Sequence, residues 1–124
     1  MNEESSITLR SYVDDLRTDH HLLITGRILE TEIRRVARKS SFGQDQVTKF
    51  LKGFEIIDHT PYQFREAGIV GPTRLRSLDA LHLATALAAN ASAMITLDQR
   101  LEQACAEVGL PVLDINIPRE YVTS

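Results

Sequence analysis

The sequence predicts a single α/β domain whose sheet is mostly parallel and is covered by helices on both faces. Three observations support this fold class. Short apolar runs alternate along the chain with segments of helical periodicity. No two runs are joined by a hairpin turn, so we expect right-handed crossovers between parallel strands. The length of 124 residues suits one domain spanning 1–124, and no linker or internal repeat divides it.

Six segments have the apolar spacing or the capping residues of helices. These segments are 5–17, 27–39, 44–52, 61–68, 78–89 and 98–108. Ser5 or Ser6 can cap the first helix, and Ser77 can cap the fifth. Thr60 followed by Pro61 combines a cap with proline at the first helical position. The fifth helix is almost wholly apolar, so we expect it to be buried on several sides.

Four short apolar runs are predicted to be strands. They are residues 21–25, 54–58, 93–96 and 111–114. The first run stops at Gly26 and suits a strand that is buried on both faces. The order of elements opens with a helix, although a strand would normally precede the first helix of such a fold. One strand is therefore expected to be missing from the beginning of the pattern.

Composition and charge exclude several classes of protein. The chain is 43% hydrophobic and 25% charged, which is ordinary for a globular domain. Its one cysteine, Cys105, permits neither an internal disulfide nor a cysteine zinc site, and it suits a reducing cytoplasm. We expect no signal peptide and no membrane span. A net charge of −3 argues against nucleic-acid binding through overall charge and leaves local patches open.

Three carboxylates are predicted to meet at the sheet edge where the strands end and the next helices begin. Glu32 lies within the apolar stripe of the second helix, whereas Glu30 is expected to face solvent. Asp79 follows the cap of the fifth helix, where an acid is also favoured by the helix dipole. Asp98 follows the third strand and can equally be the N-cap of the last helix.

Acids that converge at one edge repel one another unless a cation neutralises them. Carboxylate oxygens suit Mg²⁺ or Mn²⁺, so we predict a metal site formed by Glu32, Asp79 and Asp98. A site of this kind can activate water for the cleavage of a phosphodiester bond. His82, one turn beyond Asp79, can touch a ligand or can be a histidine satisfied by its neighbours.

A run of basic residues marks the end of the second helix. Arg34, Arg35, Arg38 and Lys39 lie there, and Arg27, Arg74 and Arg76 add further positive charge. These side chains can bind phosphates, although a run of this kind is more often a solvated face.

Four motifs together resemble the PIN-domain ribonucleases of the VapC toxin type. They are RILETEIRR (27–35), LRSLDALHLATA (75–86), ITLDQRL (95–101) and GLPV (109–112). The resemblance covers residues 3–115 and implies a three-layer sandwich with a mostly parallel sheet. It implies that Glu32, Asp79 and Asp98 are catalytic and bind metal, in agreement with the choice made from periodicity. It also implies Mg²⁺-dependent cleavage of RNA in the cytoplasm.

The resemblance fails at the N-terminus of the pattern. Members of this family usually open with an apolar strand that lies in the middle of the sheet and ends in an aspartate. This sequence has no such strand, and no apolar run precedes Asp14, Asp15 or Asp19. We therefore expect the first and central strand, with the first catalytic aspartate, to be missing.

The resemblance also implies two protein partners, a VapB-like antitoxin and a second copy of the chain. Leu9, Tyr12 and Val13 on the first helix can form such an interface, and core packing explains them equally well. Two alternatives to a nuclease remain. One is an inactive PIN-like remnant that binds antitoxin or RNA. The other is an unrelated α/β domain that binds a small molecule, in which Glu32 would be exposed and far from Asp79.

Overall fold

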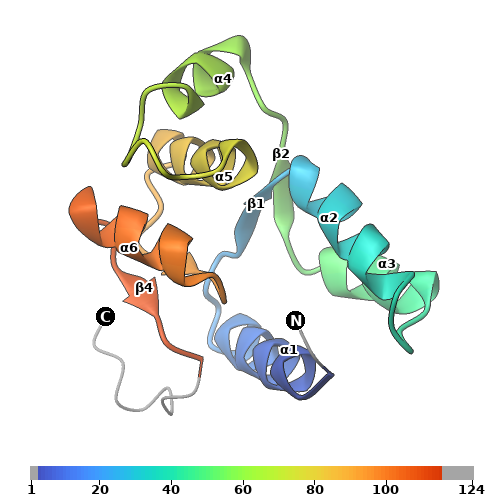
Figure 1. Ribbon diagram of the computed structural model, residues 1–124. Helices are drawn as coiled ribbons and strands as arrows, with labels where there is room; N and C mark the ends of the chain where they lie inside the picture. The colour runs from blue at the N-terminus through green and yellow to red at the C-terminus, as the bar shows by residue number, and fades with distance from the viewer. Residues whose placement is uncertain (1–2, 116–124) are drawn as a thin grey trace. The chain divides into compact units, whose positions relative to one another are not determined.

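The computed structural model describes residues 3–115, with side chains from Ile7 onward. The chain forms two compact units, which divide between Asp58 and His59. Figure 1 shows short strands among predominantly helical segments. The expectation of a single domain over 1–124 stays a prediction, and each unit is described by itself below.

The first unit contains three helices and two strands. They are α1 (Glu3–Thr18), β1 (Ile24–Gly26), α2 (Ile28–Ala37), α3 (Gln44–Leu51) and β2 (Glu55–Ile57). The strands pair in parallel with Thr25 opposite Ile56. Between α2 and α3 a small apolar core is built on Ala37, Val47 and Leu51, which are all buried. The core explains why α2 and α3 lie against each other, because each helix has one apolar stripe to bury.

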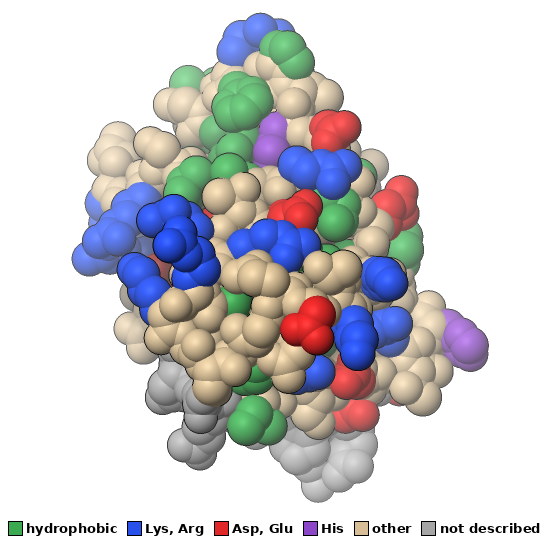
Figure 2. Space-filling model, turned by 90° about the vertical axis from the view of Figure 1, so that its right-hand side faces the viewer, with side chains coloured by type: hydrophobic (Ala, Val, Ile, Leu, Met, Phe, Trp, Pro, Cys, Tyr) green, Lys and Arg blue, Asp and Glu red, His purple; other side chains and the backbone are tan. Residues whose placement is uncertain are grey.

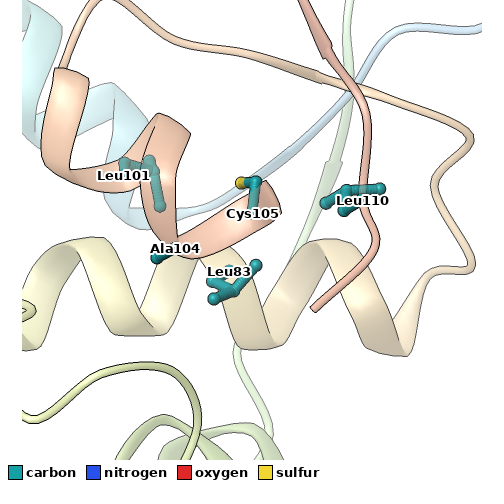
Figure 3. Packing of buried hydrophobic residues seen from close by; sticks show 5 residues of the cluster. All are labelled: Leu83, Leu101, Ala104, Cys105 and Leu110. Atoms are coloured by element: carbon teal, nitrogen blue, oxygen red, sulfur yellow. The ribbon is translucent and has the colours of Figure 1, made fainter. Parts of the chain in front are cut away.

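Between His59 and Ile115, the described part of the second unit also contains three helices and two strands. They are α4 (Pro61–Ala67), α5 (Ser77–Ala88), β3 (Met94–Ile95), α6 (Gln99–Glu107) and β4 (Val112–Leu113). Its strands pair in parallel with Met94 opposite Val112. The core of this unit joins α5 to α6 and to the segment before β4 (Figure 3). It consists of Leu83, Leu101, Ala104, Cys105 and Leu110.

All six predicted helices and the parallel pairing of the strands are confirmed, which agrees with an α/β fold. A single continuous sheet is not confirmed, because among residues 3–115 the strands form two sheets of two strands each. The strands are also shorter than predicted, since β1 starts at Ile24 and Leu22 is 69% exposed. Burial of the first strand on both faces was therefore a wrong prediction, because only Gly26 of β1 is buried.

Two predicted helix caps are wrong. The first helix begins at Glu3, so Ser5 and Ser6 lie inside it. The fifth begins at Ser77 itself, with Arg76 in extended conformation at the N-cap position. The cap predicted at Thr60 is confirmed, since its side chain accepts a hydrogen bond from the Gln63 amide. Each of these polar residues lies within three residues of the first residue of its helix, although it is not always the cap.

Candidate metal and RNA site

Glu32 lies in the middle of α2 and is half-buried. The helix places it among Ile28, Leu29 and Ile33, which are also half-buried, so the predicted stripe is present. Val36 departs from the stripe because it is 42% exposed.

Glu30 does not face solvent as predicted. Its side chain is only 34% exposed and pairs with Arg34 at 2.9 Å. The reason is the (i, i+4) spacing, which lets the long arginine side chain fold over the carboxylate. Burial alone therefore does not separate the two glutamates.

Asp79 occupies the first turn of α5 and is half-buried. The helix continues into a run of buried residues that includes Ala80 and Leu81, so the backbone at Asp79 is fixed by core packing. His82, one turn further on, is also half-buried. The burial predicted for this helix is confirmed at its centre, whereas Leu78 and Leu87 are exposed.

Asp98 is the N-cap of α6. Its Oδ1 atom accepts hydrogen bonds from the backbone amides of Arg100 at 2.7 Å and Leu101 at 3.3 Å. Its own amide donates to the Thr96 hydroxyl at 3.1 Å. The capping interpretation of this residue is therefore confirmed. Within the described part of the chain no hydrogen bond is made by Oδ2, so a second interaction through that oxygen is compatible with the cap.

Glu32 belongs to the first unit, and Asp79 and Asp98 belong to the second. Among residues 3–115, no group of three histidine, cysteine, aspartate or glutamate side chains is arranged to hold a metal ion. The shared metal site therefore stays a prediction. In donor chemistry the three residues fit Mg²⁺ or Mn²⁺, since a carboxylate with a spare oxygen, as at Asp98, is a hard ligand.

Three of the predicted phosphate-binding arginines are engaged in ion pairs. Arg27 pairs with Asp58 at 2.9 Å, and Arg74 pairs with Glu107 at 3.3 Å. Arg34 pairs with Glu30, as described above. These contacts reduce the charge available to a ligand at all three positions.

A buried polar chain in the second unit was not predicted from the sequence. The Thr85 hydroxyl, on α5, donates to Gln63 Oε1 of α4 at 3.2 Å and lies 3.0 Å from His59 Nδ1. Because the hydroxyl has one hydrogen and gives it to Gln63, the histidine must donate from Nδ1. Thr85 and Gln63 are both buried. In the sequence, the one sign of these hydrogen bonds is that Thr85 is a polar residue in a mostly apolar helix. That sign does not identify Gln63 and His59 as its partners.

Cys105 is buried in the core of the second unit, as the sequence suggested. Burial raises the pKa of its thiol, and the nearby Glu102 carboxylate raises it further. A thiol of this kind is a poor nucleophile and metal ligand, so it belongs to the core rather than to a site.

Tyr12 and Val13 are buried as well, so core packing and not an open interface accounts for them.

None of the helices between residues 3 and 115 combines the length and hydrophobicity of a membrane span.

The comparisons with known proteins identify the family of the chain. The family model of the PIN domain matches residues 2–107, which include Glu32, Asp79 and Asp98 and span both units. The chain therefore belongs to the PIN-domain family. It is of the VapC type: Ribonuclease VapC47 of Mycobacterium tuberculosis (strain CDC 1551 / Oshkosh) is 33% identical over 113 residues. That alignment covers 88% of this chain and 83% of the relative. No solved structure matches the chain.

Proposed function

We propose that this protein is a metal-dependent endoribonuclease and the toxin of a VapBC-type toxin–antitoxin pair. The observation that supports this most strongly is the similarity to Ribonuclease VapC47 along most of both chains. The acids chosen from helical periodicity fall inside the PIN match, which supports the same reaction class. Family membership alone does not assign chemistry, so the proposal depends on these residues.

Glu32, Asp79 and Asp98 are the proposed metal ligands, with Mg²⁺ or Mn²⁺ as the ion. When bound, such an ion lowers the pKa of a water molecule and stabilises the charge that develops on the phosphate. The chain contributes positioning. Two backbone amides hold the Asp98 carboxylate through Oδ1, and core packing on both sides of α5 fixes the backbone at Asp79.

Three further statements belong to this proposal. The fold is the three-layer sandwich of the family, which the parallel pairing in both sheets supports. The partners are RNA, a VapB-like antitoxin and a second copy of the chain, with the dimer surface still to be located because Tyr12 and Val13 are buried. The protein acts in the cytoplasm, where the free thiol of Cys105 stays reduced.

The experiment is RNA cleavage by the purified chain with and without Mg²⁺, beside its Asp79→Asn variant. Asparagine keeps the size of the side chain and removes its charge. We expect cleavage that needs the metal and falls at least a hundredfold in the variant, in line with the loss of one charged group from an active site. Absence of cleavage by a folded wild-type chain contradicts the proposal and favours the inactive remnant that binds antitoxin or RNA.

A further inference from the structure

We propose that the outward sides of α2 and α3, together with the turns that follow these helices, form a cationic surface that binds the phosphate backbone of RNA. The surface consists of five side chains, which are Arg35, Arg38, Lys39, Lys49 and Lys52. The inference rests on the proposed function for the identity of the nucleic acid. It adds a binding surface whose residues are not those assigned to the metal.

The positive charge of the chain is concentrated in one segment. Residues 27–54 contain seven Lys and Arg against three Asp and Glu, a net charge of +4. The remaining residues contain seven Lys and Arg against fourteen Asp and Glu, a net charge of −7. The net charge of −3 for the whole chain therefore does not show that this segment is positive. A local field of this kind attracts a polyanion even when the whole molecule is acidic.

The cationic side chains of this segment fall into two groups, those that form ion pairs and those that do not. Arg27 and Arg34 are paired with carboxylates. All five side chains of the cationic surface are exposed, and none of them forms an ion pair with another residue of the described chain. Only these five can therefore give their full charge to a ligand.

Arg34 fixes the two helices to each other. It donates from Nη1 to the Gln44 side chain at 3.1 Å and from Nη2 to the Thr48 hydroxyl at 3.0 Å. The Gln44 amide in turn donates to the Arg34 carbonyl at 3.1 Å. These contacts cross from α2 to α3, so the two helices present their charges from a connected scaffold.

The core between the helices decides which way the charges point. Ala37 of α2 and Val47 of α3 are buried against each other's helix. At 100° per residue, Arg35 lies on the side of α2 nearly opposite Ala37, and Lys49 lies on the side of α3 nearly opposite Val47. Arg38 and Lys52 are the C-cap residues of the two helices, and both are exposed. Figure 2 faces the side where Figure 1 draws α2 and α3, and it shows several groups of Lys and Arg side chains with Asp and Glu side chains between them.

The cationic surface begins close to a proposed metal ligand. Arg35 follows Glu32 by three residues, so the two positions are neighbours one turn apart on α2. A strand of RNA held at Arg35 would therefore have phosphates beside Glu32. The surface would therefore hold substrate near Glu32, which is a positioning contribution to cleavage.

The chemistry of the surface favours a nucleic acid over an acidic protein. Val36 is the one large hydrophobic residue that α2 and α3 expose in the described structure. Protein interfaces need a buried apolar centre with aromatic anchors. Surfaces that bind nucleic acid are more polar and more positively charged, which matches these five cations.

The test is the binding of a fluorescent single-stranded RNA in EDTA, so that affinity is measured without cleavage, between 50 and 200 mM salt. The test protein is Arg38→Gln/Lys39→Gln. The matched control is Arg10→Gln/Arg65→Gln, which removes the same net charge from two exposed positions outside the surface. Because each phosphate contact contributes about 0.7 to the slope of log K against log salt, we expect the test protein to lose roughly 1.4.

The outcomes separate this inference from the proposed function. A reduced slope and weaker binding in the test protein only, whether or not RNA is cleaved with Mg²⁺, support the cationic surface. Equal weakening in both variants, or no change in the test protein, overturns it even if the wild-type chain cleaves RNA. Competition by polyglutamate at the same charge concentration as strong as that by unlabelled RNA also overturns it, since the surface would then recognise any acidic polymer.

Discussion

Asp98 combines a structural contact with a proposed chemical one. Its Oδ1 atom caps α6 through two amides, and metal binding is proposed for the same carboxylate. The two contributions respond differently to substitution, because asparagine caps a helix about as well as aspartate does. Substitution at this position can therefore show whether the charge of Asp98 matters beyond the stability of the helix.

Asp98→Asn should leave the free energy of unfolding within a few tenths of a kcal/mol of wild type, and Asp98→Ala should lower it by about 1 kcal/mol. Urea denaturation measures both values. RNA cleavage should be lost in both variants if the charge binds metal. An Asp98→Asn protein that cleaves RNA at the wild-type rate would show that Asp98 is a cap alone.

Cys105 makes stability depend on pH in the alkaline range. Its pKa is raised by burial and by Glu102, so the folded state keeps the thiol proton at a pH where the unfolded chain loses it. The favourable contribution is fully present below about pH 8.5, the pKa of an unperturbed cysteine, and is lost as the pH rises through the folded pKa. The free energy of unfolding should therefore decrease over this range.

The measurement is urea denaturation of wild type and Cys105→Ala between pH 7.5 and 10. The variant should be less stable at every pH because it leaves a small cavity. Its stability should fall less steeply above about pH 8.5 than that of wild type. Parallel curves for the two proteins would mean that the thiol does not titrate differently in the folded and unfolded states.

At the scale of elements, the helices were easier to predict than the strands. Apolar periodicity and signals such as Thr60–Pro61 are local, so all six helices were found. The strands are two or three residues long, and what makes a strand is its pairing partner, which lies about 18 to 31 residues away here. An apolar run such as 21–25 therefore predicted the place of a strand but not its length or burial.

The contact between α4 and α5 depends on the buried Thr85 hydroxyl. Thr85→Val keeps the shape of the side chain and removes its hydrogen bonds to Gln63 and His59. The buried Gln63 amide oxygen then loses this donor, so we expect the free energy of unfolding to fall by about 1–3 kcal/mol. Thermal and urea denaturation measure this value.

Thr73→Val is the matched control for Thr85→Val, because Thr73 is exposed in the same unit. Its stability should stay within about 0.5 kcal/mol of wild type. Equal effects at the two positions would mean that the Thr85 hydroxyl contributes nothing beyond the change of side-chain type.

At the scale of the whole molecule, the sequence located the acids but could not show them together. Helical spacing placed Glu32 on a half-buried stripe and Asp79 in a first turn, and both positions are confirmed. Whether the two carboxylates share a metal stays a prediction, because they lie some fifty residues apart in the sequence and no local pattern reports such a distance. The same limit applies to the basic residues, because the sequence does not show which arginines are neutralised by carboxylates.

The central proposal is that Glu32, Asp79 and Asp98 bind a metal ion. It is tested most directly by binding of Mn²⁺, followed by electron paramagnetic resonance, to wild type, Glu32→Gln and Asp79→Asn. Glu55→Gln serves as the control, since Glu55 is an exposed acid on β2. We predict that Glu32→Gln and Asp79→Asn each weaken binding at least tenfold, whereas Glu55→Gln does not. Wild-type affinity in Glu32→Gln would contradict the account, because Glu32 would then not be a metal ligand.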